Sequence, residues 1–351
     1  MHNNPFVEGG KMIRTFSICP VCYKRIPATI SVVDGQAVMS KVCPVHKKFG
    51  ALIDPDGGMF LRNYNTGTMG INKAVLVPVT RTCNMSCGSP SWCYTKGVPI
   101  PENSAKYYDR HLHDLKQAGF AILLSGGEPT CRKDFVEFSN ELKALGWPVV
   151  TMSNMIAFAD GNFMKTCGYI HGGTLWADFS MQHPKNYSSE ILSAKMQALS
   201  NLENLGIKAN CIQFSVSDLD ELPWIREFYN DTKRLYKNIR IRTLHGFWKD
   251  KSEKIYLSQL YKAFLDNFAD LMPSQDFRLE STNIYSIYMR TDHCGISLSS
   301  SPTVHNVDLA SCSRPTYGIA LDGKFYGFPV AQIISEGIEK GWYNGYKIQS
   351  E

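Results

Sequence analysis

Several features that define whole classes of proteins are missing from this chain of 351 residues. No apolar run approaches the roughly 20 residues of a membrane-spanning helix, and the N-terminus lacks the apolar core of a secretory signal. We therefore expect a cytoplasmic protein with no membrane span. Lysine and arginine form no run typical of nucleic-acid or membrane binding, because the net charge of +5 is spread along the chain. No fixed-period repeat is visible, so we expect neither a solenoid nor a propeller.

The composition is that of an ordinary globular protein, with 44% hydrophobic and 20% charged residues. The length suffices for one large α/β core and a small additional domain. The eleven cysteines are more informative. A cytoplasmic compartment keeps thiols reduced, so we expect metal ligands or free thiols rather than disulfides.

Two cysteine knuckles near the N-terminus carry four side chains that zinc accepts. Cys19 and Cys22 form the first knuckle, and Cys43 and His46 form the second, in the pattern C-x2-C-x20-C-x2-H. Four protein ligands indicate a closed structural zinc site, which would stabilise a segment with little core of its own. Rubredoxin-like iron and a disulfide are the alternatives.

The sequence between the knuckles has the residues of a β-hairpin, with a turn signal at Asp34-Gly35. A polar stretch rich in glycine and asparagine, Arg62–Asn72, then has the composition of a connector. Residues 1–70 are therefore predicted to form a small zinc ribbon with its linker.

From Ala74 onward, short apolar runs of strand length alternate with longer segments of helical period. The expected strands are Ala74–Thr80, Ala121–Ser125, Pro148–Ser153, Gly173–Ser180, Ala209–Ser215 and Ile239–Thr243. The expected helices lie near Ala105–Ala118, Asp134–Leu145, Ser189–Leu205, Leu219–Tyr236 and Tyr256–Met272. Such units favour parallel strands with functional loops at their carboxyl ends. The predicted fold class is α/β, a partial (β/α)6 TIM-like barrel over residues 71–274 with an irregular C-terminal extension over 275–351.

Three cysteines follow the first barrel strand at the spacing C-x3-C-x5-C: Cys83, Cys87 and Cys93. A structural zinc site has four protein ligands, whereas three thiolates on a [4Fe–4S] cluster leave one iron open for chemistry. A zinc site with a distant fourth ligand and three unrelated buried thiols are the alternatives.

This loop resembles the signature of the radical S-adenosylmethionine (SAM) superfamily, with Trp92 at the aromatic position before the third cysteine. The family spacing is C-x3-C-x-aromatic-C, so this loop, with five residues between Cys87 and Cys93, is three residues longer. The turn Gly126-Gly127-Glu128, after the second strand, resembles the family's GGE motif. The resemblance implies that the three cysteines hold a [4Fe–4S] cluster and that SAM chelates its open iron. Reductive cleavage of SAM then yields a 5′-deoxyadenosyl radical.

The resemblance also suggests further contact residues for SAM and substrate. Glycines allow close backbone approach, so carbonyls of the turn and the Glu128 carboxylate are expected to receive the ammonium of SAM. Ser153, Asn154 and Ser180 end later strands and are expected near the SAM ribose and carboxylate. Arg242 and His245 are candidates for binding a substrate or SAM carboxylate; a salt-bridged arginine and an exposed histidine are the alternatives.

A CPxC…CPxH segment before such a core resembles radical SAM proteins of the tetraether lipid synthase and pterin methylase type. In the tail, the hairpin-like element Gly318–Phe328 resembles the family's auxiliary-cluster element, but Phe328 occupies the position of its cysteine. Cys294 and Cys312 supply only two ligands, so no second cluster is expected. Cys312 is a candidate catalytic thiol, with an inert buried cysteine as the alternative.

The sequence thus predicts a radical SAM enzyme with a [4Fe–4S] cluster, SAM and Zn2+. We expect hydrogen abstraction from a small-molecule, nucleotide or lipid substrate, in an oxidoreductase or transferase reaction, with flavodoxin or ferredoxin as electron donor. A peptide-modifying radical SAM maturase is one alternative. A non-enzymatic zinc-ribbon protein that binds nucleic acid or peptide is the other.

Overall fold

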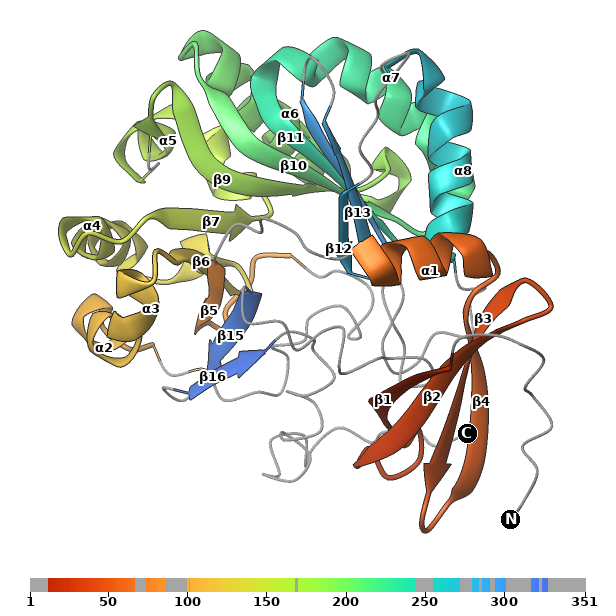
Figure 1. The fold of residues 1–351 in the computed structure, drawn as a ribbon. Helices are drawn as coiled ribbons and strands as arrows, with labels where there is room; N and C mark the ends of the chain where they lie inside the picture. The colour runs from red at the N-terminus through yellow and green to blue at the C-terminus, as the bar shows by residue number, and fades with distance from the viewer. Residues whose placement is uncertain are drawn as a thin grey trace.

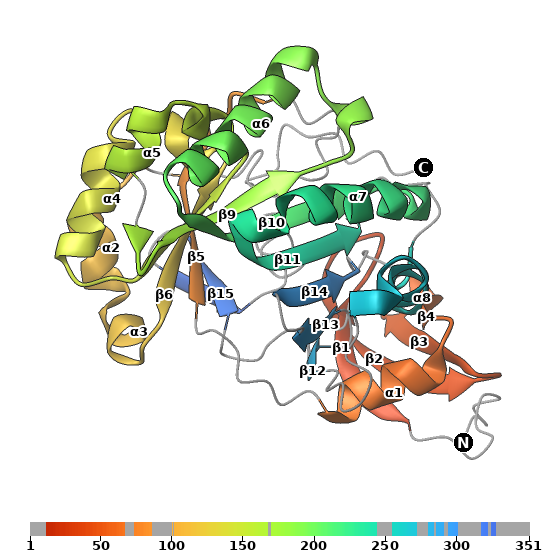
Figure 2. The ribbon, with the colours of Figure 1, turned by 90° about the horizontal axis from the view of Figure 1, so that it is seen from above.

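The computed structural model describes residues 12–66, 74–85, 100, 102–167, 170–243, 255–271, 280–283, 286–290, 294–300, 317–321 and 324–327. Two sheets organise these residues (Figure 1). A small antiparallel sheet lies at the N-terminus, and a large mixed sheet carries helices on its outer face (Figure 2). The predicted fold class, an α/β barrel-like core with an N-terminal ribbon, is confirmed.

The N-terminal sheet contains four antiparallel strands in chain order. They are β1 (Ile13–Ile18), β2 (Arg25–Val33), β3 (Gln36–Cys43) and β4 (Lys47–Asp54). Asp34 and Gly35 connect β2 to β3 with φ of 48° and 77°, which is the left-handed backbone of a two-residue hairpin. The predicted hairpin is therefore confirmed.

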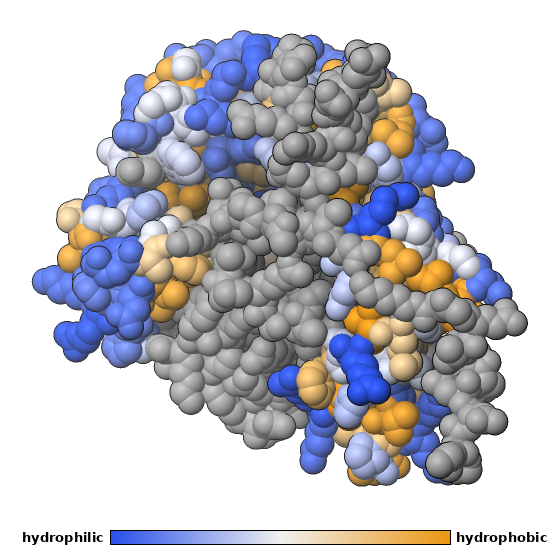
Figure 3. All heavy atoms as spheres, viewed as in Figure 1, coloured by the Kyte–Doolittle hydropathy of each residue, from blue (hydrophilic) through white to orange (hydrophobic). Residues whose placement is uncertain are grey.

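The ribbon leaves much apolar surface exposed. Five of the seven large hydrophobic side chains exposed in the described part of the chain belong to it: Met12, Phe16, Val21, Val42 and Val45. Figure 3 shows orange, hydrophobic residues over this part of the molecule. A sheet of this size has too few buried side chains to stabilise itself, which agrees with a fold that depends on a metal.

Helix α1 (Gly57–Thr66) joins the ribbon to the larger sheet. The expectation of a connector from Arg62 was wrong for the first residues of that stretch. The Asp56 carboxylate accepts a hydrogen bond of 2.8 Å from the Met59 amide and caps the helix. Phe60 packs in the ribbon core, and Met59 packs in the core of the large sheet. Tertiary packing therefore stabilises this helix, which the polar composition of the segment does not indicate.

The large sheet contains six neighbouring parallel strands that match the six predicted ones. They are β5 (Ala74–Thr80), β6 (Ala121–Gly126), β7 (Val149–Ser153), β9 (Thr174–Met181), β10 (Lys208–Val216) and β11 (Tyr236–Thr243). Two further parallel strands extend this row, β14 (Gly295–Ser299) beside β11 and β15 (Tyr317–Leu321) beside β5.

Antiparallel strands complete the sheet at its edges. They are β8 (Ile170–His171) on β9, β13 (Ser286–Arg290) on β14, β12 (Glu280–Asn283) on β13, and β16 (Lys324–Gly327) on β15. The pair β15–β16 confirms the predicted C-terminal hairpin. Over the described residues the strand order ends at β12 and β16, so the barrel stays open.

Helices cover the outer face of the parallel strands, as Figures 1 and 2 show. They are α2 (Ala105–His111), α3 (His113–Gln117), α4 (Phe135–Ala144), α5 (Gly161–Cys167), α6 (Ser189–Asn204), α7 (Leu222–Thr232) and α8 (Leu257–Phe268). The helix expected over Ala105–Ala118 is broken at Leu112, whose side chain is buried. Helix α5 was not predicted, because its seven residues are too short for a helical period.

One polar contact connects the ribbon to the barrel. The Asp54 carboxylate, at the end of β4, accepts hydrogen bonds from the Asp56 amide (2.9 Å) and from the Ser258 amide (3.1 Å) in the first turn of α8. Asp54 therefore caps a barrel helix from the ribbon.

None of the helices in the described ranges combines the length and the apolarity needed to cross a bilayer.

Candidate functional site

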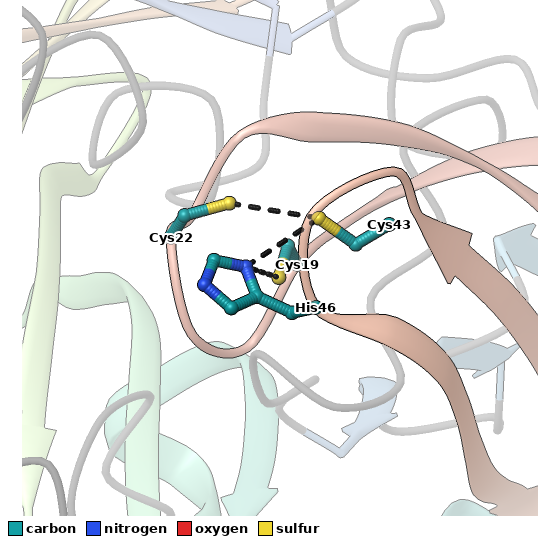
Figure 4. A group of neighbouring side chains, drawn as sticks. All are labelled: Cys19, Cys22, Cys43 and His46. Atoms are coloured by element: carbon teal, nitrogen blue, oxygen red, sulfur yellow. Dashed lines mark hydrogen bonds between the residues drawn. The ribbon is translucent and has the colours of Figure 1, made fainter.

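The four predicted zinc ligands come together at one end of the ribbon (Figure 4). The Nδ1 atom of His46 lies 3.6 Å from the Cys19 sulfur and 3.5 Å from the Cys43 sulfur, and the Cys22 and Cys43 sulfurs are 3.8 Å apart. A tetrahedral zinc ion with ordinary bond lengths would separate two sulfurs by about 3.8 Å and a sulfur from a nitrogen by about 3.5 Å. The donor set and its spacing therefore fit zinc.

The backbone shapes this site through two similar knuckles. Each ends in a residue with left-handed backbone, Tyr23 after the first and Lys47 after the second. The Val21 amide lies 3.4 Å from the Cys19 sulfur, so it can donate to the thiolate. The pKa of Cys43 is lowered to about 6, chiefly by hydrogen bonding from the His46 backbone amide. This hydrogen bonding favours the thiolate of Cys43, the form that binds metal, whereas burial raises the pKa of Cys22.

A disulfide is excluded for these cysteines. All seven cysteines whose side chains are described are free thiols. The distance of 3.8 Å between the Cys22 and Cys43 sulfurs is nearly twice a disulfide bond. The disulfide alternative is therefore wrong for this segment.

The second site begins where the loop after β5 leaves the sheet. Cys83 lies in this loop with an exposed side chain. Cys87, Cys93 and Trp92 lie outside the described residues, so their predicted roles stay predictions. The structure does define the base of the loop and the Gly126-Gly127-Glu128 turn beside it.

The two glycines let this turn pack directly on the loop that carries Cys83. The Gly127 amide donates to the Thr80 carbonyl (2.9 Å), and the Glu128 amide donates to the Thr82 carbonyl (2.8 Å). Gly126 has a φ of 132°, and a Cβ atom there would collide with the Thr80 carbonyl. The sequence predicted close backbone approach at this turn, and the neighbour that approaches is the cluster loop.

Glu128 joins the ends of two strands with a buried carboxylate. Its Oε1 atom accepts hydrogen bonds from the Thr130 amide (3.2 Å), the Thr130 hydroxyl (2.7 Å) and the Ser153 hydroxyl (2.9 Å). Its Oε2 atom accepts one from the Asn154 amide (2.7 Å). Burial raises the pKa of Glu128, while these donors oppose that shift. The carboxylate therefore fixes the turn after β6 to the end of β7.

Asn154 continues this connection to the cluster loop. Its side-chain amide donates a hydrogen bond of 2.7 Å to the side-chain oxygen of Asn84, the residue after Cys83. Ser153 and Asn154, two of the predicted SAM contacts, thus lie beside Glu128, and Asn154 also contacts the residue that follows Cys83, a predicted cluster ligand. Sequence reasoning missed Asn84, because nothing in the local pattern marks one asparagine in a loop.

Sequence reasoning also missed Lys195 on α6, whose side chain is fully buried. Its ammonium donates to the carbonyls of Asn154 (2.7 Å) and Ser180 (2.8 Å), and lies 4.8 Å from the Tyr187 ring centroid. Lys195 therefore ties the end of β7 to the end of β9, where the predicted SAM contacts lie. A lysine in an amphipathic helix gives no sign of this role, because most such lysines are exposed.

We expect Lys195→Met to weaken SAM binding about tenfold, because it removes the two hydrogen bonds that hold the ends of β7 and β9 together. The measurement is the dissociation constant of SAM for the cluster-loaded protein. Lys165→Met, at an exposed position of α5, is the control and should bind SAM as the wild type does. Unchanged SAM affinity in a folded Lys195→Met protein would contradict this role.

The remaining predicted residues are only partly described. Arg242 lies half-buried on β11 and is paired in register with Ser215 of β10. His245 and Cys312 lie outside the described residues. Cys294 is buried, with its sulfur 3.8 Å from the Tyr229 hydroxyl, among side chains that pack against the outer helices. This agrees with the interpretation of Cys294 as an inert core residue.

Comparison with known proteins finds a family that matches the ribbon and a curated relative that matches a longer region of the chain. Residues 12–55 match the family described as the HMPTM N-terminal zinc ribbon domain. The chain is 25% identical over 233 residues to the 7,8-dihydro-6-hydroxymethylpterin dimethyltransferase of Methanocaldococcus jannaschii, a match that covers 55% of this chain and 45% of that protein. The matched region is thus less than half the length of this curated relative.

Two solved structures show a weaker likeness. SuiB of Streptococcus suis bound to S-adenosylmethionine has a TM-score of 0.42 at 15% identity, covering 59% of this chain and 47% of SuiB. An archaeal TYW1 has a TM-score of 0.35 at 14% identity, covering 70% of this chain and 86% of that chain. The ribbon match and the curated relative confirm the predicted resemblance to radical SAM proteins of the pterin methylase type that carry an N-terminal zinc ribbon.

Proposed function

We propose that this protein is a radical SAM enzyme that reductively cleaves SAM and abstracts hydrogen from a small-molecule substrate. The observation that carries the proposal is the hydrogen-bonded unit formed by the Gly126-Gly127-Glu128 turn, the end of β7 and the loop that begins with Cys83. It lies at the carboxyl edge of a parallel sheet, where such folds place their reactive groups.

In this proposal, Cys83, Cys87 and Cys93 would hold a [4Fe–4S] cluster, which would supply the electron for the reductive cleavage of SAM. The chain's own residues fix the geometry. Glu128 holds the turn against the loop, and its Oε2 atom accepts only one of the hydrogen bonds named above. A carboxylate oxygen has two lone pairs, so Oε2 has the capacity to accept a proton of the SAM ammonium as well. Asn154 and Ser180, held by Lys195, face the rest of SAM.

The experiment is anaerobic reconstitution with iron and sulfide, followed by measurement of 5′-deoxyadenosine formed from SAM with dithionite. We expect 5′-deoxyadenosine from the wild type and none after Cys83, Cys87 and Cys93 are all replaced by alanine. Cys294→Ala is the matched control, because its sulfur lies in the apolar core, and it should retain the cluster. The proposed activity would be refuted if the cluster-loaded wild type formed no 5′-deoxyadenosine. It would also be refuted if the triple variant still bound a full cluster.

For the substrate, we propose a pterin-type heterocycle, with 6-hydroxymethyl-7,8-dihydropterin as the first compound to test. The support is the curated relative, whose printed activity is methylation of such a compound, and the ribbon of the same type. Mass spectrometry of the pterin after incubation with reductant and SAM, which would serve both as radical source and, through further molecules converted to S-adenosylhomocysteine, as methyl donor, would show a gain of one or two methyl groups. An unchanged pterin alongside abundant 5′-deoxyadenosine would refute this substrate and leave the enzyme class intact. We further propose a cytoplasmic location and a flavodoxin or ferredoxin as electron donor.

A further inference from the structure

The inner face of the sheet is polar at the strands farthest from the cluster loop. Phe179, Ile212, Ile239 and Leu298, one from each of β9, β10, β11 and β14, pack in the core beneath the outer helices. Because side chains alternate along a strand, their neighbours in the chain face the concave interior. Asp178 and Ser180 on β9 and Gln213 on β10 are among those inward neighbours.

Register brings these inward side chains into rows across the sheet. One row runs from Ser180 through Gln213 and Arg240 to Ser297. The next row, nearer the carboxyl edge, places Arg242 between Ser215 and Ser299. Arg242 thus lies between two serines, and Arg240 lies between Gln213 and Ser297.

Contacts within this face orient Arg240. Its Nη1 atom donates to the Gln213 side-chain oxygen (3.3 Å) and lies 4.0 Å from the Asp178 carboxylate. Asp178 in turn accepts a hydrogen bond of 2.6 Å from the Asn210 side chain. Because the Gln213 oxygen faces the guanidinium, its NH2 group is left to donate elsewhere. The row therefore presents donors more than acceptors.

The charge of this face is positive. On the inward positions described for β9, β10, β11 and β14, two guanidiniums occur with one carboxylate. The Asp178 side chain is 7% exposed, whereas that of Arg240 is 36% exposed, so the cation is the group that a ligand meets. Guanidinium groups beside hydroxyls are the donors that proteins use for carboxylates and phosphates.

We propose that Arg240 and Arg242 form a subsite on the inner face of the barrel for an anionic group, carboxylate or phosphate, of the substrate. The uncharged 6-hydroxymethyl-7,8-dihydropterin lacks such a group, so the subsite points to a phosphorylated or carboxylated pterin as the substrate that binds more tightly. The inference rests on the proposed function, because a substrate must enter the barrel to meet the radical. SAM's own carboxylate is the competing occupant. The predicted SAM contacts Asn154 and Ser180 lie on β7 and β9, however, whereas the arginines lie on β11, which β10 separates from β9.

The test uses three small aromatic probes with cluster-loaded, SAM-bound protein: benzoate, phenyl phosphate and uncharged benzyl alcohol. Saturation-transfer NMR under anaerobic conditions gives their dissociation constants. We expect at least one anion to bind about tenfold more tightly than benzyl alcohol, and Arg240→Gln to remove that preference. Arg234→Gln is the control, because Arg234 pairs with Glu203 on the exposed helical side and should leave all three constants unchanged.

The three probes also identify the group. If only benzoate binds, the subsite is specific for a carboxylate, and if only phenyl phosphate binds, it is specific for a phosphate. If both bind, the subsite recognises the negative charge that the two groups share. The proposal is overturned if neither anion binds more tightly than benzyl alcohol, or if the Arg240→Gln protein still binds the anion more tightly than the alcohol. It is also overturned if Arg240→Gln weakens SAM as much as it weakens the anions. Measuring 5′-deoxyadenosine in the same preparations tests the proposed function separately.

Discussion

Gly127→Ala is expected to lower the rate of 5′-deoxyadenosine formation at least about 100-fold, the typical cost of moving reacting groups by roughly 1 Å. A Cβ atom at position 127 would lie 2.5 Å from the Thr82 carbonyl oxygen and 2.6 Å from that of Arg81. Both neighbours are backbone atoms directly before Cys83, so the clash is relieved only by separating the turn from the loop. That separation breaks the hydrogen bonds to Thr80 and Thr82.

The measurement combines iron and sulfide content per chain with the rate of SAM cleavage after anaerobic reconstitution. Gly161→Ala is the control, because its new Cβ atom would meet only the Asn201 side chain at an ordinary 3.7 Å. It should keep wild-type iron content and rate. A Gly127→Ala protein that cleaves SAM at the wild-type rate would show that the glycine pair does not position the cluster loop.

Cys43→Ala is expected to unfold the ribbon while the barrel remains folded. Structural zinc contributes about 10–16 kcal/mol of apparent binding free energy in zinc-finger peptides, more than a small sheet recovers from its own core. The ribbon core contains only a few buried side chains, among them Ile30, Met39 and Phe60. The barrel has a separate and larger core, so it should survive the loss.

Zinc content and hydrogen exchange measure this outcome together. We expect the zinc content to fall from about one ion per chain to near zero, and the amides of β1 to β4 to lose their protection while those of β9 to β11 keep theirs. Val45→Ala is the control in the same knuckle, because that side chain is 74% exposed and cannot coordinate metal. Full protection of the ribbon in a zinc-free Cys43→Ala protein would refute a structural role for the metal.

The sequence predicted the elements that local chemistry determines. Each of the six barrel strands was found within three residues of its predicted ends. The strands β5, β6 and β7 are nearly continuous apolar runs, and β9, β10 and β11 alternate apolar with polar residues, so both kinds are visible in the sequence. The ribbon ligands were recognisable because zinc restricts both residue type and spacing. The hairpin at Asp34-Gly35 followed from the left-handed backbone that this turn requires.

Only the tertiary structure decided how distant residues meet. Asn84 and Asn154 are 70 positions apart, and Lys195 reaches Asn154 from α6. Such contacts depend on strand order and register, which the pattern of one segment does not contain. For the same reason the sequence did not show that donors from β7 and from the turn surround the Glu128 carboxylate.

The sequence by itself determined which chemistry the chain carries, because thiols, glycines and apolar periodicity are local properties. The fold determined where that chemistry takes place. It brought the Gly126-Gly127-Glu128 turn onto the loop of Cys83, and it turned Arg240 and Arg242 toward the barrel interior. The physical reason is that backbone hydrogen bonds between parallel strands fix the neighbours of each side chain only when the whole sheet has formed.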